Sequence, residues 1–235
     1  MTFQETFAKI AQSGLPLQAK LDAFKFEFDN NLAPPAAVEV LHRSTDELIA
    51  SGAQNRALKV GNIAPAFTLP DPDGKLVSSE VLLEYGPLVV TFYRGAWCPF
   101  CNLDLSALEE ARSEIEARGA TLVAISQQTA PNSRKSLRQI ELGFPILGDH
   151  GGEIAAAFHV RWTLPDYLRE VQKALGADLV QFNGEDSWTL PMPARYVIAQ
   201  DGTIAYAEVN ADYTRRPEPS AIYPVLEQLS SRQFA

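Results

Sequence analysis

The feature that most constrains this fold is a run of strand-forming residues that leads directly to a pair of cysteines. Residues 88–93, Leu-Val-Val-Thr-Phe-Tyr, are aliphatic, β-branched or aromatic throughout, as expected of a strand buried on both faces. Cys98 and Cys101 follow within a few residues. Apolar residues then recur at helical spacing as far as Gly119. The predicted order is therefore strand, cysteine pair, helix.

The position of the pair at the start of a helix indicates its chemistry. The unpaired N–H groups and the positive dipole end of a helix N-terminus stabilise a thiolate. Cys98 and Cys101 lie about one helical turn apart, which lets their sulfurs form an intramolecular disulfide. Pro99 suits a first turn, where its missing N–H has no partner in any case. The pair predicts reversible dithiol–disulfide chemistry.

Two other roles for the cysteines have less support. A tetrahedral zinc site needs four ligands, and His42, His150 and His159 are not spaced as partners of the pair. Reduced cysteines also occur in protein cores without any function. A C-x-x-C between a buried strand and an amphipathic helix favours redox function over both alternatives. We therefore expect no metal and no bound organic cofactor.

Charge and hydropathy exclude several classes of partner. The formal net charge is −9 at pH 7, so the average surface field repels nucleic-acid phosphates and anionic lipid. No apolar run approaches the roughly 18 residues of a membrane span, and Glu5 stands where a signal peptide carries cations. We expect a cytoplasmic protein that binds neither nucleic acid nor membranes. Thiols are kept reduced in that compartment, which agrees with a catalytic pair.

The chain divides by its pattern into two parts. Residues 1–56 carry apolar residues at helical spacing in three segments, so we predict an N-terminal helical extension that packs against the domain or a second subunit. Residues 57–235 form the main domain, with a charged insertion at about 161–190 that contains a helix over 166–175 and a loop around 183–186. Strand and helix alternate from residue 88 to residue 158, which predicts an α/β fold with parallel strands in its core. Hairpins are predicted around Asp73-Gly74 and Asp201-Gly202.

Several blocks of this sequence, in this order, resemble the AhpC/TSA redoxins (alkyl hydroperoxide reductase and thiol-specific antioxidant), the peroxiredoxin-like branch of the thioredoxin superfamily. The similarity covers about residues 60–229, and the matching blocks are 60–70, 92–93, 144–149, 152–160 and 196–202. The resemblance implies a thioredoxin-like fold with a central mixed sheet flanked by helices. It also implies a thiol-dependent peroxidase and a homodimer. The substrates would be hydrogen peroxide or organic hydroperoxides, with electrons from a thioredoxin, glutaredoxin or glutathione-type reductant.

The cysteine pair departs from the usual pattern of that family, P-x-x-x-T-x-x-C with a distant Arg. Alignment at the strand end, Tyr93, places Cys101 at the peroxide-reacting position, Cys98 at the Thr position and Arg94 at the Pro position. Asp104 falls where the family usually has an acid or Gln. The Thr hydroxyl would have stabilised the leaving oxyanion. Cys98 in its place supplies a resolving thiol for a sulfenic acid on Cys101.

Other candidate residues surround the pair. The distant Arg of the family falls at Pro193, which resembles the cis-proline beside a thioredoxin disulfide. Arg195 lies two residues on, so it projects from the same strand face. Arg94 or Arg195 is the candidate replacement for the missing cation, with an exposed ion pair as the alternative. Trp97 is expected to border the pocket because it abuts Cys98. Residues 213–219 either cap the site or a subunit interface, or form a solvated turn.

Two rival functions use the same cysteines. In a thiol–disulfide oxidoreductase, Cys98 attacks a substrate disulfide, Cys101 resolves it, and Pro193 lines the groove for the partner chain. Trp97 precedes Cys98 there, as in thioredoxins. In a redox-responsive binding module, the disulfide moves the insertion. The peroxidase and oxidoreductase schemes exchange the roles of the two sulfurs, and that order stays open at this point.

Overall fold

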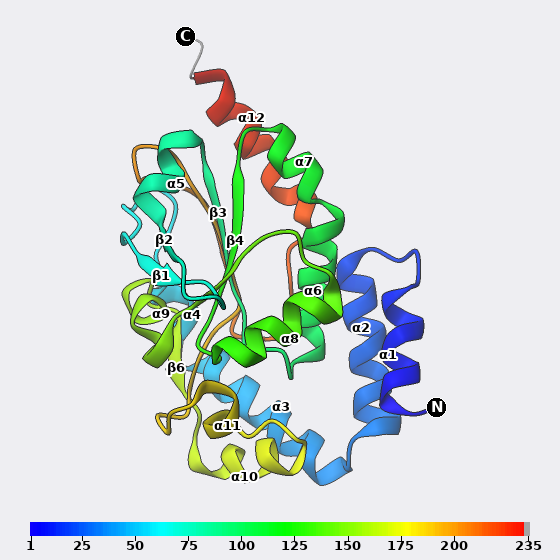
Figure 1. The fold of residues 1–235 in the computed structure, drawn as a ribbon. Coiled ribbons are helices and arrows are strands. Elements are labelled where there is room, and N and C mark those ends of the chain that lie inside the picture. Colours follow the sequence, from blue (N-terminus) through cyan, green and yellow to red (C-terminus); the bar gives the residue numbers. More distant parts are fainter. Residues whose placement is uncertain (233–235) are drawn as a thin grey trace.

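The centre of the molecule is a five-stranded sheet (Figure 1). In spatial order its strands are β5 (Ile146–Gly148), β4 (Thr121–Ser126), β3 (Leu88–Phe92), β8 (Ala194–Ile198) and β9 (Ile204–Val209). The computed structural model describes residues 1–232. β3 is parallel to β4 and antiparallel to β8, with Val90 opposite Val123 and Tyr196. Every residue of β3 is buried, as its continuous apolar sequence predicts.

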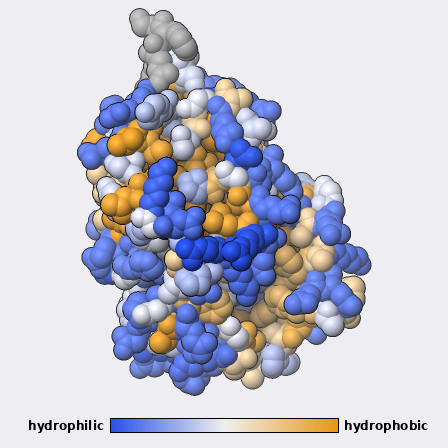
Figure 2. Space-filling model, viewed as in Figure 1, coloured by the Kyte–Doolittle hydropathy of each residue, from blue (hydrophilic) through white to orange (hydrophobic). Residues whose placement is uncertain are grey.

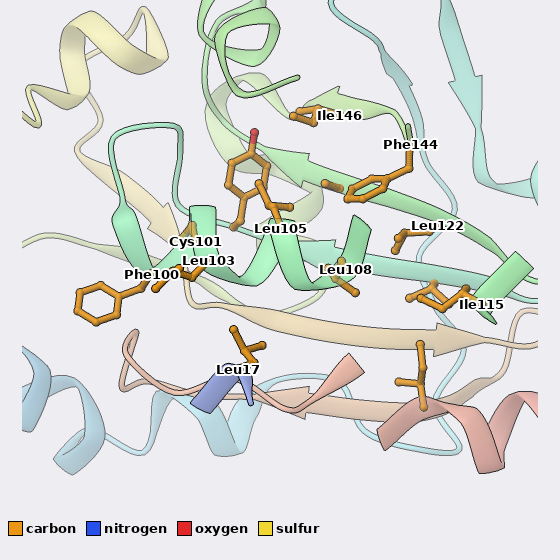
Figure 3. Close-up of a cluster of buried hydrophobic side chains, with 14 of the residues drawn as sticks. Leu17, Phe100, Cys101, Leu103, Leu105, Leu108, Ile115, Leu122, Phe144 and Ile146 are labelled. Carbon is orange, nitrogen blue, oxygen red and sulfur yellow. The ribbon is translucent and has the colours of Figure 1, made fainter. Parts of the chain in front are cut away.

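Helices cover both faces of this sheet. One face carries α6 (Pro99–Glu110), α7 (Arg112–Ala117), α8 (Ala130–Ile140) and α12 (Tyr223–Arg232), which follows the 3-10 turn η3 (Pro219–Ile222). The other carries α4 (Ala53–Arg56), α5 (Ser79–Tyr85) and α9 (Glu153–Ala157), which follows the turn η2 (His150–Gly152). Figure 3 shows the core on the first face, where Leu105 and Leu108 of α6 lie over Leu122 and Ile146 of the strands. The predicted mixed sheet flanked by helices is confirmed.

Both predicted hairpins are present. β1 (Thr68–Pro70) pairs antiparallel with β2 (Leu76–Ser78), and β8 pairs antiparallel with β9 across the turn at Asp201 and Gly202. Gly202 has φ +82°, a left-handed conformation that a side chain would strain. The antiparallel pairing of β8 with β3 makes the sheet mixed, while β3, β4 and β5 form the predicted parallel core.

Four helices occupy the N-terminal residues, where three were predicted. They are α1 (Phe3–Ala11), α2 (Leu17–Glu27), α3 (Pro35–Ala50) and the short α4, with a π-helical turn η1 (Phe28–Leu32) after α2. α1 and α2 lie beside α6 (Figure 1). The Phe24 ring is fully buried and meets the ring of Phe100 edge-on, with 5.5 Å between the ring centres. Because Phe100 stands between the two cysteines, the extension packs directly against the start of α6.

The segment from residue 161 to residue 191 forms a small unit of its own. β6 (Arg161–Thr163) and β7 (Thr189–Pro191) pair antiparallel, and α10 (Asp166–Ala174) fills the predicted helical stretch. A further helix, α11 (Leu179–Asn183), ends where a loop was predicted. Leu168 and Leu179 are buried with Leu41 of α3. The segment and the N-terminal helices therefore share one apolar cluster.

The surface contrasts with these buried clusters. Hydrophilic residues cover most of the face shown in Figure 2, with small hydrophobic areas between them. None of the helices within residues 1–232 is long and apolar enough to cross a membrane.

Candidate active site

The cysteine pair lies where β3 gives way to α6. Cys98 is the N-cap residue of α6 and Cys101 lies in its first turn, so the predicted order of strand, pair and helix is confirmed. Both thiols are free and buried, with exposures of 1% for Cys98 and 0% for Cys101. A side-chain hydrogen bond joins them. The sulfurs are thus next to each other at a helix N-terminus, which is the arrangement that dithiol–disulfide cycling needs.

Arg94 brings a positive charge to the pair. Its backbone N–H donates to Cys101 Sγ at 3.4 Å, and its guanidinium Nη1 lies 3.7 Å from Cys98 Sγ. The side chain is buried, with its guanidinium carbon 4.0 Å from the centre of the Tyr213 ring and 4.7 Å from that of Trp97. Of the two cations that the sequence offered, Arg94 is the one that the structure places at the sulfurs.

A second guanidinium reaches the pair from a residue that sequence reasoning did not single out. Arg216 Nη2 donates to Cys101 Sγ at 3.4 Å, and Arg216 Nε lies 3.3 Å from Asp104 Oδ2. Its side chain is only 3% exposed. Arg216 belongs to the segment 213–219 that was predicted to cap the site or form a solvated turn. No spacing rule distinguishes it there from its neighbour Arg215, which is half exposed.

Asp104 and Arg195 stand behind these contacts. Arg195 Nη2 donates to Asp104 Oδ1, and both side chains are almost fully buried. Arg195 Nη1 donates to the carbonyl of Pro217 at 3.0 Å. Arg195 therefore supports Asp104 and the segment that carries Arg216, and it donates to these groups instead of to a cysteine. The acid at position 104 links the two arginines, since each occupies one of its oxygens.

Tyr93 and Trp97 hold the turn around the cysteines. The buried Tyr93 hydroxyl accepts a hydrogen bond from Gln128 Nε2 at 2.6 Å, while Gln128 Oε1 accepts the N–H of Ala96 at 2.8 Å. Tyr93 is thus a support of the turn. Trp97 lines the same cavity as Cys98, where it was expected. A Cβ at Gly95 would lie 2.6 Å from Trp97 Nε1, so only glycine lets the indole fold back here.

Pro193 differs from its expectation. The peptide bond before it is trans, because none of the bonds among the described residues is cis. Here the chain passes straight from β7 into β8, and the N–H of Asn210 donates to the Pro193 carbonyl. An extended path of this kind needs no cis bond. Pro193 lines a neighbouring hollow that shares Leu41, Arg94, Gln172 and Tyr213 with the cavity at Cys98, but Pro193 does not line that cavity itself.

A cavity of about 80 Å³ opens onto Cys98 but not onto Cys101. Its walls are mostly apolar and come from the N-terminal helices, the α6 start, the α10 segment and the segment after β9. They include Phe3, Phe28, Leu41, Phe100, Leu175 and Tyr213, with Arg94 as the one cation among the lining residues. This volume holds a few water-sized molecules. Cys98 is therefore the sulfur that a small molecule meets.

Burial and charge act in opposite directions on the two thiols. Burial would raise the pKa of Cys98, but the hydrogen bond with Cys101 and the charges of Arg94 and Arg216 lower it to about 6. Burial raises the pKa of Cys101, and the adjacent Cys98 anion raises it further. The surroundings therefore favour the thiolate at Cys98 over the thiolate at Cys101.

The site offers nothing further to a metal. Within residues 1–232, no group of three or more His, Cys, Asp or Glu side chains is placed to hold a metal ion.

The mixed sheet and the cysteine pair at the start of α6 define a redox protein of the thioredoxin fold. The family model "AhpC/TSA family" matches residues 60–207, and the chain belongs to this family. The resemblance seen in the sequence is thus confirmed.

Relatives and solved structures agree. The chain is 24% identical to peroxiredoxin Q of Triticum aestivum over 84% of its own length and 82% of the relative's. The chain is 28% identical to peroxiredoxin Q of Oryza sativa subsp. japonica over 62% of its own length and 57% of the relative's, so it spans just over half of that relative. Among solved structures, peroxidoxin BcpB from Mycobacterium tuberculosis has a TM-score of 0.58 at 22% identity, covering 74% of this chain and 97% of its own. That structural likeness establishes the thioredoxin-like fold.

Proposed function

We propose that this protein is a thiol-dependent peroxidase that reduces hydrogen peroxide or organic hydroperoxides through a Cys98/Cys101 dithiol–disulfide cycle. The observation that carries the proposal is the position of Cys98 at the wall of a small apolar cavity, with two guanidinium groups at the sulfurs. Membership of the AhpC/TSA family and the peroxiredoxin names of the relatives support it.

The proposed cycle begins with attack of the Cys98 thiolate on one oxygen of the peroxide. The O–O bond breaks, the leaving oxyanion takes a proton to become water or an alcohol, and Cys98 becomes a sulfenic acid. The guanidinium of Arg94 lies where it donates to the leaving oxyanion, replacing the Thr hydroxyl of the usual pattern. Cys101 then attacks the Cys98 sulfur, water leaves, and a disulfide forms. A dithiol reductant restores both thiols by exchange.

This order of the sulfurs differs from the one that the family alignment suggested. The alignment put Cys101 at the peroxide-reacting position, but Cys101 does not line the cavity and its pKa is raised. Cys98 lines the cavity and its pKa is lowered. Both access and charge therefore favour Cys98 as the first nucleophile and Cys101 as the resolving thiol.

Single cysteine variants test the proposal and its order. In stopped-flow assays, Cys101→Ser should react once with peroxide and stop at a sulfenic acid, which dimedone labels at Cys98. Cys98→Ser should lose peroxide reactivity by roughly 1000-fold or more, as expected for removal of a nucleophile. A sulfenic acid on Cys101 of Cys98→Ser would reverse the order. A reduced wild type that consumes no peroxide would refute the peroxidase itself.

A thiol–disulfide oxidoreductase is the second candidate, favoured by the lowered pKa of Cys98 at a helix N-cap. The trans Pro193, outside the cavity at Cys98, counts against a thioredoxin-type peptide groove. Reduction of insulin disulfides by the wild type, abolished in Cys98→Ser and combined with no peroxide consumption, would select this function. Inactivity in both assays would leave the redox-responsive binding module.

We infer that the electrons come from a thioredoxin, glutaredoxin or glutathione-type reductant and that the protein works as a homodimer in the cytoplasm. Family membership supports the first two inferences, and the sequence pattern supports the third. The rice and wheat relatives are named as chloroplastic proteins. Turnover assays with each reductant and sedimentation of the purified protein test the first two, and fractionation of cells tests the third.

A further inference from the structure

The segment that delivers Arg216 to Cys101 is held from the core side by buried charges. The carbonyl of Pro217 accepts a hydrogen bond from Arg195, and Asp104 contacts both Arg195 and Arg216. Arg216 Nη1 also donates to the carbonyl of Tyr213 at 2.7 Å, which curls the segment around its own side chain. These contacts fix the guanidinium. They leave the backbone N–H of Arg216 without a core partner.

The N-terminal helix α2 holds the same segment from the opposite side. Gln18 Oε1 accepts the backbone N–H of Arg216 at 3.1 Å, and Gln18 Nε2 lies 3.4 Å from the carbonyl of Thr214. In return, the Glu218 carboxylate accepts the N–H groups of Leu17 and Gln18 at 3.1 and 3.0 Å. Pro16 provides no side-chain cap for α2. Glu218 of the segment 213–219 caps this helix instead, and Gln18 of the same helix holds the segment.

The polar contacts of Gln18 are separate from the apolar packing of α2. Leu17, Leu21 and Phe24 bury the apolar face of α2 in the core. Gln18 lies at the edge of that face. Its Oε1 accepts the N–H of Arg216, and its Nε2 donates to Asp22 Oδ1 at 2.9 Å as well as to the carbonyl of Thr214. Only a primary amide side chain offers both an acceptor and a donor in this geometry. The partners in residues 214–216 lie 196 and 198 residues along the chain.

We propose that Gln18 is a positioning residue of the active site, whose amide holds the backbone of residues 214–216 so that the Arg216 guanidinium reaches Cys101. The inference rests on the proposed function for its consequence in turnover, but the geometry concerns the cysteine pair itself. It gives the N-terminal helices a part in the chemistry. Loss of the two hydrogen bonds from Gln18 to residues 214–216 should lower the rate of peroxide reduction at pH 7 by about 3- to 10-fold.

The test compares Gln18→Ala with Gln12→Ala in the reduced full-length protein. Gln12 lies on the same extension with an exposed side chain, and alanine suits helix α2. Thiolate absorbance near 240 nm is titrated against pH, and peroxide reduction is followed by stopped flow. Gln18→Ala should shift the thiolate titration to higher pH and slow the reaction, whereas Gln12→Ala should match the wild type. Gln18→Met, which keeps the volume, should behave as Gln18→Ala and replaces it if that variant is poorly folded.

A double-mutant cycle with Arg216→Met separates positioning from general stability. If Gln18 acts through Arg216, its replacement should have no further effect on the thiolate titration once Arg216 is gone. Equal effects in both backgrounds, or a Gln18→Ala titration identical to the wild type, would overturn the inference. The titration needs no peroxide. A wild type that is inert to peroxide would therefore refute the proposed function while the role of Gln18 is still decided.

Discussion

Two regions of this molecule each bring one guanidinium to the same pair of sulfurs, and they do so in different ways. Arg94 lies in the turn that links β3 to α6, four residues before Cys98. Arg216 comes from a segment 115 residues after Cys101. Arg94 rests on the rings of Trp97 and Tyr213, while Arg216 is paired with a buried carboxylate. The first cation is placed by a local turn, and the second by a network of tertiary contacts.

Replacement of Arg216 should therefore have the largest effect and should reach both stability and reactivity. Arg216→Met removes one partner of Asp104, which keeps Arg195, so the free energy of unfolding should fall by about 3 kcal/mol, at the low end for a broken buried ion pair. Peroxide reduction at pH 7 should slow by roughly 10- to 100-fold. Urea unfolding and stopped flow measure the two effects. A wild-type unfolding curve would contradict the tertiary role assigned to this arginine.

Replacement of Arg94 should separate the two effects. No carboxylate among the described residues forms an ion pair with Arg94, so Arg94→Met should lower the free energy of unfolding by only about 1 kcal/mol, the contribution of its ring contacts. The reaction should still slow by roughly 10-fold or more, because the thiolate and the leaving oxyanion lose a donor. The same two assays apply. If Arg94→Met unfolds as readily as Arg216→Met, the contrast between the regions fails.

The pH dependence of the reduced protein reports the charge that both regions stabilise. With a Cys98 pKa of about 6, peroxide reduction should rise as pH passes through 6 and become level above about 7. The ordinary pKa of a cysteine, which applies to the unfolded chain, is 9.0. Between pH 6 and pH 9 the unfolded chain therefore binds more protons at Cys98 than the folded protein does. Stability of the reduced protein should therefore rise with pH in that window, and this contribution should be lost as pH falls through 6.

Cys98→Ser is the reference for that measurement, since it removes the titrating group. Its free energy of unfolding should lack the rise between pH 6 and pH 9. A parallel rise in the variant would assign the effect to other groups. Arg94→Met and Arg216→Met should each move the midpoint of the wild-type rate profile to higher pH, which tests the two regions by one observable.

The smallest effect on stability and rate is expected for Glu218, which joins the segment 213–219 to the start of α2. Glu218→Ala removes the acceptor for two N–H groups at the start of that helix and should cost about 1 kcal/mol of unfolding free energy. The rate of peroxide reduction should change by less than the 3- to 10-fold expected for Gln18→Ala. The exposed Glu110 provides a matched control as Glu110→Ala. Equal unfolding of the two variants would argue against the cap.

The contrast between the local turn at Arg94 and the distant segment at Arg216 also explains which features could be predicted from the sequence. A buried strand, a C-x-x-C and a helix are neighbours along the chain, so their periodicity and spacing predicted the turn and the pair. Arg94 was one of two candidate cations, and the sequence did not choose between them. The parallel core and both hairpins were predicted for the same reason, whereas the mixed sheet was implied by the family resemblance. Trp97 was placed correctly because it abuts Cys98.

Residues that meet only through the folded chain were harder to assign. Arg195 was chosen as a candidate cation from its strand face, and that face does point toward the site, yet Asp104 and Pro217 take its donors. The cis bond expected at Pro193 was wrong, because a similarity of position does not fix the path of the backbone. Arg216 and Gln18 act across nearly the whole chain, and no local pattern distinguishes them from solvated neighbours.

The long separation in sequence between Cys101 and Arg216 means that the two residues are synthesised at different times. A ribosome adds roughly 5 to 20 residues per second, so the codon for Arg216 is read roughly 6 to 23 s after that for Cys101. Until then the two cysteines of the nascent chain lack the Arg216 guanidinium, and Gln18 of α2 lacks its partners in residues 214–216. The activation proposed for the thiols therefore requires that residue 216 has been added to the chain and has reached the cysteine pair.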